Sequence, residues 1–115
     1  MKNISEIADV IRSKNAGPYE ITLDIIFKTK IEYQVLKRNH LISKEKIADI
    51  YQIPVGEIKS IIYYDPAIAI KITLIRKIVS GSPGDTDVYG AQQHAPLLQL
   101  NFDSSLFLSK ISRTR

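Results

Sequence analysis

The 115-residue sequence contains no cysteine. Disulfides, thiolate chemistry, and zinc or iron–sulfur sites built from cysteine are therefore excluded, and a chain without disulfides suits the reducing cytoplasm. The sequence also lacks any run of the ~20 apolar residues that cross a bilayer. Its N-terminus, MKNISEIADV, carries charges where the apolar part of a signal peptide would lie. We therefore expect a soluble, cytoplasmic protein that does not associate with membranes.

Charge of one sign is only slightly in excess, with 16 Lys and Arg against 12 Asp and Glu. The basic residues are scattered, apart from a group between Lys28 and Lys46 and the tail from Lys110 to Arg115. A nucleic-acid-binding protein would gather such charge on one face together with stacking aromatic side chains. We interpret the basic residues as solvated helix surface, and we rank nucleic acid last among the partners.

Length and composition indicate a single globular domain. A chain of 115 residues can bury one core, and 44% hydrophobic with 24% charged residues is ordinary globular composition. We predict an α+β domain over residues 1–102 and a C-terminal extension over residues 103–115. The extension keeps Leu106, Phe107 and Ile111, and it is either a docking helix or a partly ordered tail.

Two interpretations are open for the first residues. Asn3 and Glu6 have the spacing of a capping box, and apolar residues at helical spacing follow, namely Ile4, Ile7, Ala8 and Ile11. Residues 8–13 fit a short strand equally well. The segment 13–18, SKNAGP, collects residues that favour tight turns. Residues 21–27 then alternate between apolar and polar, which predicts a strand with one buried face.

Helical spacing predicts two helices after that strand. The first begins near Thr29 and is closed by Asn39 and His40, and the second begins after Ser43 and ends before Pro54. The apolar residues that these helices would bury are Ile31, Val35 and Leu36 in the first, and Ile47, Ala48, Ile50 and Tyr51 in the second.

Two runs rich in β-branched residues follow, and Asp65-Pro66 separates them with a turn signal. We predict a hairpin of strands 58–64 and 67–79, the second of which is the longest strand and lies in or next to the centre of the sheet. Residues 97–102 predict a last short strand.

This order of elements predicts a two-layer α+β sandwich, with a mainly antiparallel or mixed sheet and helices on one face, ferredoxin-like or related. If the second and third strands are parallel, the helix pair forms a right-handed crossover between them. The opposite face of the sheet carries Thr22, Asp24, Lys71 and Thr73. That face is either exposed to solvent or in contact with a partner.

A polar segment, SGSPGDTDVYGAQQHAP at Ser80–Pro96, holds three of the five glycines. We place the functional site in this loop, because loops between strands commonly carry binding residues. Asp85, Asp87 and His94 offer the oxygen and nitrogen donors that bind Mg²⁺ or Mn²⁺. In the alternative, which we favour, the two aspartates cap a short helix and His94 hydrogen-bonds a carbonyl.

The same segment also suits recognition of an anion. Backbone N–H groups from Ser80 to Gly84, ahead of the predicted helix, can face a phosphate or a carboxylate. The segment is not a P-loop, because the Gly-Lys-Ser/Thr ending is missing. Gln92 and Gln93 fix geometry without titrating, so they suit recognition more than acid–base catalysis. No Ser-His-Asp, Cys-His or paired-glutamate arrangement follows from the spacing.

Three stretches resemble the small bacterial family known as domain of unknown function 4387, also described as AtuA-related small proteins. They are IADVIRSKNAGPYEITLDIIF, IIYYDPAIAIKIT and SGSPGDTDVYGAQQHAPLL, and the resemblance covers residues 4–102. It implies a partner, because such proteins are encoded beside a large protein of the acyclic terpene utilisation A (AtuA) type. Some relatives of that large protein end in a similar ferredoxin-like segment. The resemblance therefore implies a detached C-terminal domain in which residues 8–13 form a strand.

The residues that match the family motifs form two sets. The first is Ser13, Lys14, Asn15 and Gly17, and the second is Ser80, Gly81, Ser82, Gly84, Asp85, Thr86, Asp87, Tyr89, Gly90, Gln92, Gln93 and His94. We predict that both sets bind a ligand at one rim of the sheet, because the strands that precede them would end side by side there.

Two functional hypotheses follow. In the first, the chain is a small subunit that completes a larger AtuA-like enzyme acting on an organic acid or an acyl-thioester. This hypothesis also allows the chain to form a homo-oligomer. In the alternative, it is a stand-alone metal- or anion-binding enzyme of the lyase or hydratase type. That enzyme would use Asp85, Asp87 and His94, with a divalent metal as the cofactor.

Overall fold

Four strands whose apolar residues alternate form one antiparallel sheet. The computed structural model of the chain describes residues 1–17, 19–75 and 94–107. The strand order is β2-β3-β5-β4, in which β2 spans Ala8–Asn15, β3 spans Glu20–Phe27, β5 spans Ala69–Ile75 and β4 spans Ile58–Tyr64. The hairpin of β4 and β5 and the interior place of β5 are as predicted.

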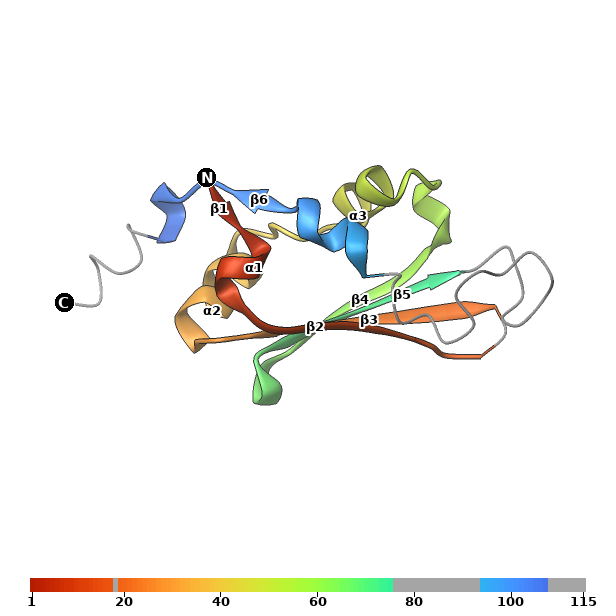
Figure 1. Cartoon of the computed structure of the whole chain (residues 1–115), viewed down its shortest axis with the longest axis horizontal. Helices are drawn as coiled ribbons and strands as arrows, with labels where there is room; N and C mark the ends of the chain where they lie inside the picture. The colour runs from red at the N-terminus through yellow and green to blue at the C-terminus, as the bar shows by residue number, and fades with distance from the viewer. Residues whose placement is uncertain (18, 76–93, 108–115) are drawn as a thin grey trace.

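The α-helices lie over one face of this sheet (Figure 1). They are α1 (Ile4–Ile7), α2 (Lys30–Arg38) and α3 (Lys44–Tyr51). The short 3-10 helices are η1 (Val55–Glu57), η2 (Asp65–Ala67) and η3 (Ala95–Gln99), and a second small sheet pairs β1 (Lys2–Asn3) with β6 (Asn101–Phe102). The predicted α+β sandwich with helices on one sheet face is confirmed.

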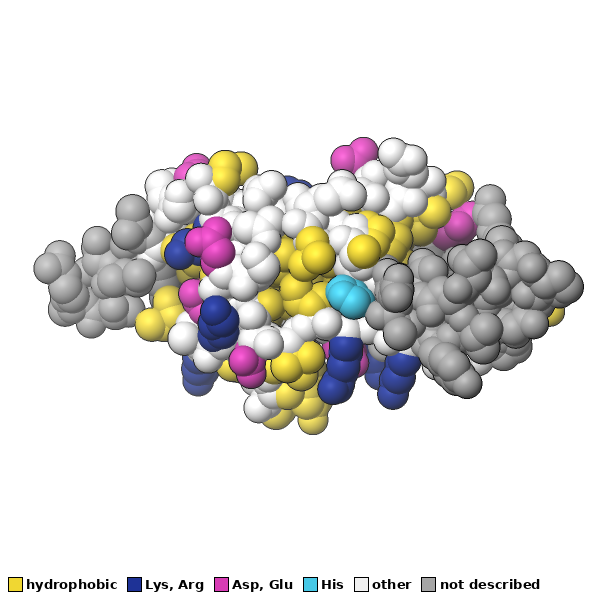
Figure 2. Space-filling model, in the orientation of Figure 1, with side chains coloured by type: hydrophobic (Ala, Val, Ile, Leu, Met, Phe, Trp, Pro, Cys, Tyr) yellow, Lys and Arg dark blue, Asp and Glu magenta, His cyan; other side chains and the backbone are white. Residues whose placement is uncertain are grey.

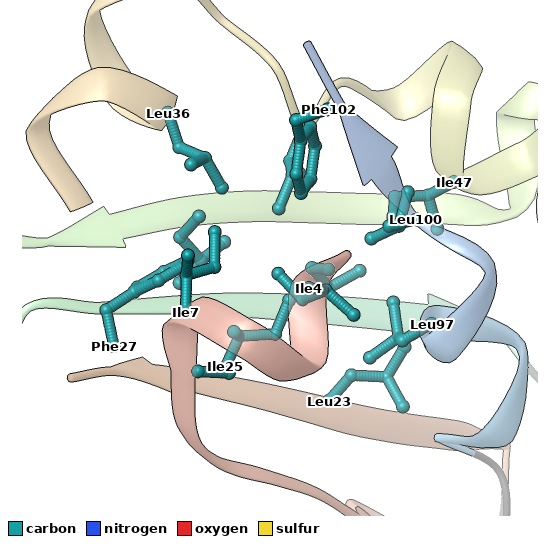
Figure 3. Packing of buried hydrophobic residues seen from close by; sticks show 14 of the residues in the cluster. Ile4, Ile7, Leu23, Ile25, Phe27, Leu36, Ile47, Leu97, Leu100 and Phe102 are labelled. Carbon is teal, nitrogen blue, oxygen red and sulfur yellow. The ribbon is translucent and has the colours of Figure 1, made fainter. Parts of the chain in front are cut away.

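The core lies between the helices and the face of the sheet that they cover. Leu23 and Ile25 of β3 and Ile72 of β5 are completely buried there. Figure 3 shows Leu97 of η3 directly above Leu23, so the segment after residue 93 returns onto this face. Burying one such side chain stabilises the fold by about 1.5–3 kcal/mol.

The opposite face, here called the uncovered face, has no described helix over it (Figure 1). The strand register assigns fourteen residues to it: Val10, Arg12, Lys14, Glu20, Thr22, Asp24, Ile26, Ser60, Ile62, Tyr64, Ala69, Lys71, Thr73 and Ile75. Among them only Thr22 is buried, and it lies between Lys14 and Thr73 on the neighbouring strands. The predicted placement of Thr22, Asp24, Lys71 and Thr73 on this face is therefore confirmed.

The predicted crossover is present in a modified form. β3 and β4 run in the same direction, but β5 lies between them and is antiparallel to both. With the helix pair α2 and α3 as the connection, these elements form a split βαβ unit. A ferredoxin-like domain has the order βαββαβ, with two such units. The described residues contain one of them, so the chain is related to that topology rather than identical to it.

At the N-terminus, a helix and a strand were both predicted as alternatives, and each is correct for part of the segment. The side chain of Asn3 accepts from the backbone N–H of Ser5, and Glu6 Oε2 accepts from the backbone N–H of Asn3 at 2.8 Å. This capping box starts α1. The helix ends after Ile7, because Ala8 is extended (φ −93°, ψ 135°) and begins β2.

The helix boundaries are close to those predicted. Thr29 and Ser43 are the N-caps, and their hydroxyl oxygens accept backbone N–H groups of the first turns. One predicted core residue is wrong, since Ile31 is 38% exposed whereas Tyr33 is completely buried. Two residues along a helix turn the side chain by about 200°, so only one of this pair can face the sheet.

Three predicted strand boundaries are corrected. The turn begins at Ala16 instead of Ser13, because β2 continues through Asn15 in register with Ile21. Strand β5 begins at Ala69, since Ile68 has the left-handed φ of 44° at the end of η2. At the C-terminal end, Leu97 lies in η3 and only Asn101–Phe102 is strand.

The start of the C-terminal extension packs on the domain. Residues 105–107 form a helical turn, and the Phe107 side chain is buried in the core. Phe107 thus packs on the domain, while residues 108–115, the rest of the predicted extension, lie outside the described residues. No helix within residues 1–17, 19–75 and 94–107 is long and apolar enough to span a membrane.

Candidate functional site

The site is built on one rim of the sheet, where β2 and β5 end and β3 and β4 begin. Asn15 of β2 pairs with Ile21 of β3, which in turn pairs with Leu74 of β5. These three residues therefore form one row, and neighbouring strands are about 4.8 Å apart. The ends of β2 and β5 consequently lie about 10 Å from each other, two strand spacings apart. The end of β2 and the last described residues of β5 are thus near neighbours, and residues 76–79 of the predicted strand lie outside the described residues.

Both predicted polar sets adjoin this rim in the chain. Ser13–Asn15 is the last part of β2, and Gly17 lies in the turn that follows. The second set begins at Ser80, five residues beyond Ile75 in the sequence. Its members Ser80, Gly81, Ser82, Gly84, Asp85, Thr86, Asp87, Tyr89, Gly90, Gln92 and Gln93 lie outside the described residues. How they meet Ser13–Gly17 stays a prediction.

His94 is the described member of the second set. It precedes η3, and its backbone carbonyl accepts the N–H of Leu97 at 2.9 Å. Leu97 packs over Leu23 (Figure 3), and Leu23 pairs with Ser13 in the strand register. The segment therefore returns to the sheet on the covered face, close to the end of β2.

Strand alternation separates the first set into two groups. Ser13 and Asn15 pair with the buried Leu23 and Ile21, so their side chains belong to the covered face. Lys14 lies between them in the sequence and belongs to the uncovered face. A ligand bound on the side of η3 would meet Ser13 and Asn15, and Lys14 would face away from it.

Gly17 has a conformational reason to be glycine. The N–H of Ala16 donates to the carbonyl of Glu20 at 2.9 Å, which closes the turn between β2 and β3. Within this turn Gly17 has a φ of 116°, a region that residues with a Cβ rarely adopt. No heavy atom lies within 4 Å of the position that a Cβ would take. Glycine is therefore required at this position by the backbone conformation and not by lack of space. The surface around Gly17 is open.

One ion pair crosses the uncovered side of the rim. Lys59 Nζ of β4 lies 2.5 Å from Glu20 Oε2 of β3, across the intervening strand β5. This pairing neutralises a carboxylate that would otherwise repel an anionic ligand.

Metal binding at the rim has no support within the described part of the chain. No group of three or more His, Asp or Glu residues that could hold a metal ion occurs in residues 1–17, 19–75 and 94–107. Asp85 and Asp87 lie outside those residues, so the predicted divalent metal stays a prediction.

A shallow groove of about 500 Å³ runs between α3 and η1. Its lining residues are Glu45, Ala48, Asp49, Gln52, Ile53, Pro54 and Val55. Two of these carry carboxylates and none carries a positive charge, so the lining would repel an organic acid. This groove is a poor site for the proposed class of ligand.

A second polar cluster lies at the opposite end of the sheet. Asp65, in the turn between β4 and β5, accepts the Tyr33 hydroxyl at 2.5 Å and the Lys37 ammonium at 2.7 Å. Hydrogen bonds from Lys37 and then Tyr33 lower the pKa of the Asp65 carboxyl. Burial, followed by the bond to Asp65, raises the pKa of Tyr33 far above its ordinary value. The cluster ties α2 to the hairpin turn.

The sequence contains a partial signal for this cluster. Tyr33 and Lys37 are four residues apart and share one face of α2. Asp65, however, lies 32 residues from Tyr33 in the sequence, so only the fold reveals the third member. A hydroxyl with a raised pKa is a hydrogen-bond donor and not a base, which fits a structural role.

Comparison with known proteins identifies one family. Residues 4–101 match the model of the family described as Domain of unknown function (DUF4387). No curated protein and no solved structure matches the chain.

Proposed function

The chain belongs to the DUF4387 family, and from this premise we propose that it is a small subunit of a larger enzyme. In this proposal it binds a large protein of the AtuA type in the cytoplasm. It contributes polar loops to a shared site for an organic acid or an acyl-thioester. The large protein supplies the remaining groups that the reaction needs.

The row of Asn15, Ile21 and Leu74 is the observation that carries the proposal. It brings the end of β2 and the last described residues of β5 to one rim, about 10 Å apart. The polar segment Ser80–Pro96 follows five residues beyond Ile75 in the sequence. The described rim residues Ser13, Asn15 and His94 carry hydroxyl, amide and imidazole groups. Such groups orient a ligand by hydrogen bonds, and this supports a role in recognition.

The chemistry of the ligand follows from the donors that the two segments provide. A carboxylate or a thioester carbonyl accepts hydrogen bonds, and the glycine-rich start of Ser80–Pro96 has backbone N–H groups to donate. At the described rim, Lys59 pairs with Glu20 and balances that carboxylate.

The proposal is tested by mixing the chain with the purified large AtuA-type protein encoded beside it. Light scattering coupled to gel filtration should show one complex whose mass exceeds that of the large protein. Calorimetric titration of this complex with acetyl-coenzyme A and, separately, with acetate should show binding that the isolated chain lacks. If the two proteins elute apart at micromolar concentrations, the small-subunit function is wrong.

A matched pair of serines tests the position of the site. Ser13→Ala, at the rim on the covered face, should weaken ligand binding by the complex. Ser60→Ala, on the uncovered face of β4, should leave ligand binding unchanged. Tight binding of Mg²⁺, Mn²⁺ or Zn²⁺ by the isolated chain, abolished by Asp85→Ala, would instead favour a stand-alone metal enzyme.

A further inference from the structure

The uncovered face carries an apolar row that crosses all four strands. Val10 pairs with Ile26, Ile26 with Ala69, and Ala69 with Tyr64. Ile62, two residues before Tyr64, extends this row on β4. Val10, Ile62 and Tyr64 are 36%, 51% and 55% exposed. Exposed aliphatic and aromatic side chains gathered in register mark a surface that binds a partner.

Cations lie next to this apolar row. Figure 2 shows dark blue Lys and Arg side chains beside yellow hydrophobic ones along the lower side of the molecule, beneath the sheet. Arg12 of β2 is paired with Asp24 of β3, with Nε to Oδ2 at 3.2 Å. Lys14 and Lys71 form no ion pair within the described part of the chain. Asp24 lies opposite Lys71 in the strand register as well as next to Arg12. Among the described residues of this face, the four cations Arg12, Lys14, Lys59 and Lys71 therefore outnumber the two carboxylates of Glu20 and Asp24.

We propose that the uncovered face is the docking surface for the larger subunit. This rests on the small-subunit function proposed above. The matching surface of the larger subunit is apolar opposite Val10, Ile62 and Tyr64, and it carries carboxylates opposite Lys14 and Lys71. Charge complementarity of this kind selects the partner and speeds its association.

A second copy of the chain fits this face poorly. Two uncovered faces packed together would place the net positive charge of one copy against the net positive charge of the other. The carboxylates Asp24 and Glu20 are already paired with Arg12 and Lys59. Like charges placed face to face in an interface cost several kcal/mol. The charges therefore favour a different, acidic protein surface.

Nucleic acid fits the face poorly as well. A sheet that binds single strands offers aromatic side chains on which bases stack. On the uncovered face, the central strands β3 and β5 present Thr22, Asp24, Ala69 and Thr73, and Tyr64 stands on the outer strand β4. The central strands thus provide no stacking platform.

The size of the face indicates where the interface continues. Four strands of about seven residues cover roughly 23 by 19 Å, or about 400 Å². A stable interface buries about 800 Å² on each partner, so the larger subunit must also contact adjacent surface. Lys14 lies next to the Gly17 turn at the rim. An interface that extends over this turn places the partner against the proposed ligand site.

The test measures binding to the purified AtuA-type protein by calorimetry in 50 mM NaCl. Ile62→Asp and Lys71→Glu change the uncovered face, and Ile31→Asp on α2 and Lys44→Glu on α3 are the matched controls on the helical side. We expect each face variant to weaken the complex at least about tenfold, and each control to stay within about twofold of wild type. Raising NaCl to 300 mM should weaken wild type more than Lys71→Glu.

The outcomes separate this inference from the function on which it rests. If the wild-type chain does not bind, the small-subunit function fails and the docking surface with it. If wild type binds and both face variants bind equally well, the docking surface is wrong while the function stands. A dimer of the isolated chain that Ile62→Asp dissociates would assign the face to a second copy and overturn the inference. Unfolding midpoints establish that each variant is folded, and Lys71→Glu decides the question should Ile62→Asp not fold.

Discussion

The two faces of the sheet are made by the same four strands and have opposite properties. On the covered face, Leu23, Ile25 and Ile72 are completely buried. On the uncovered face, Val10 is exposed, and Ile62 is exposed beside Lys71. Successive residues of a strand point to opposite faces, so residues next to each other in the sequence have different roles. Substitutions on the covered face should therefore change folding, and those on the uncovered face should change binding.

The largest expected effect compares two isoleucines on neighbouring strands. Ile72→Ala on the covered face removes a completely buried side chain, and we expect it to lower the free energy of unfolding by about 2–5 kcal/mol. Ile62→Ala on the uncovered face should cost less than about 0.5 kcal/mol. Urea unfolding followed by circular dichroism measures both. Equal losses would show that the uncovered face is buried in the isolated chain.

The second-largest expected effect on stability concerns Gly17, in the turn at the rim of the sheet. Gly17→Ala must adopt a φ of 116°, and we expect a loss of about 1 kcal/mol or more in the free energy of unfolding. Gly56→Ala is the control, since that glycine also has open space around it and its φ is not positive. The control should be neutral or slightly stabilising. A loss at Gly56 as large as that at Gly17 would contradict the conformational explanation.

The third prediction is a pH dependence at the end of the sheet opposite the rim. The pKa of Asp65 is lowered by hydrogen bonds from Lys37 and Tyr33. Since the folded-state pKa is the lower one, this stabilisation is present above the unfolded pKa of about 3.9 and is lost as the pH falls through the folded value. The pKa of Tyr33 is raised. That contribution is present below a pH of about 10 and is lost as the pH rises above it.

Urea unfolding between pH 2 and pH 8 measures the acid side of this dependence. Asp65→Asn should be less stable than wild type at pH 7, and the difference should shrink toward pH 2. Tyr63→Phe is the control, because its hydroxyl donates to the backbone carbonyl of Ile42 at 2.9 Å and not to a carboxylate. A pH-independent difference between Asp65→Asn and wild type would exclude the carboxylate as its cause.

The smallest effect belongs to the ion pair between Lys59 and Glu20. The Lys59 side chain is 57% exposed, and exposed pairs contribute about 0–1 kcal/mol. We expect Lys59→Ala to change the free energy of unfolding by less than about 0.5 kcal/mol, and less still in 0.5 M NaCl. A change above 1 kcal/mol would mean that the pair supports the rim more strongly than solvent-exposed charges usually do.

The alternation of apolar residues was enough to predict the sheet. Ile21, Leu23, Ile25 and Phe27 are buried, as their spacing indicates, and the first three pair with residues of β5. The starts of the helices were predictable, because the hydroxyls of Thr29 and Ser43 accept backbone N–H groups only three residues further along the chain. The helix face was harder to predict, because Ile31 and Tyr33 are both apolar enough to be buried and only the sheet decides between them.

The candidate site was predictable only in part. The sequence places two polar segments after two strands, and the strand register brings the ends of those strands together. The separation of Lys14 from Ser13 and Asn15 was missed, because a turn was predicted where β2 continues. The link from Asp65 to Tyr33 joins residues 32 positions apart, and no local pattern encodes such a contact. The uncovered face was foreseen as a surface, but its apolar row required the register of all four strands.

The central claim is that the uncovered face meets the larger subunit, and methyl NMR of the chain labelled at its isoleucines tests it most directly. Ile62 and Ile75 report on the uncovered face, and Ile31, which is also exposed, reports on the helical side. On addition of the unlabelled AtuA-type protein, the methyl signals of Ile62 and Ile75 should shift while that of Ile31 should stay in place. Shifts at Ile31 with Ile62 and Ile75 unchanged would contradict the claim.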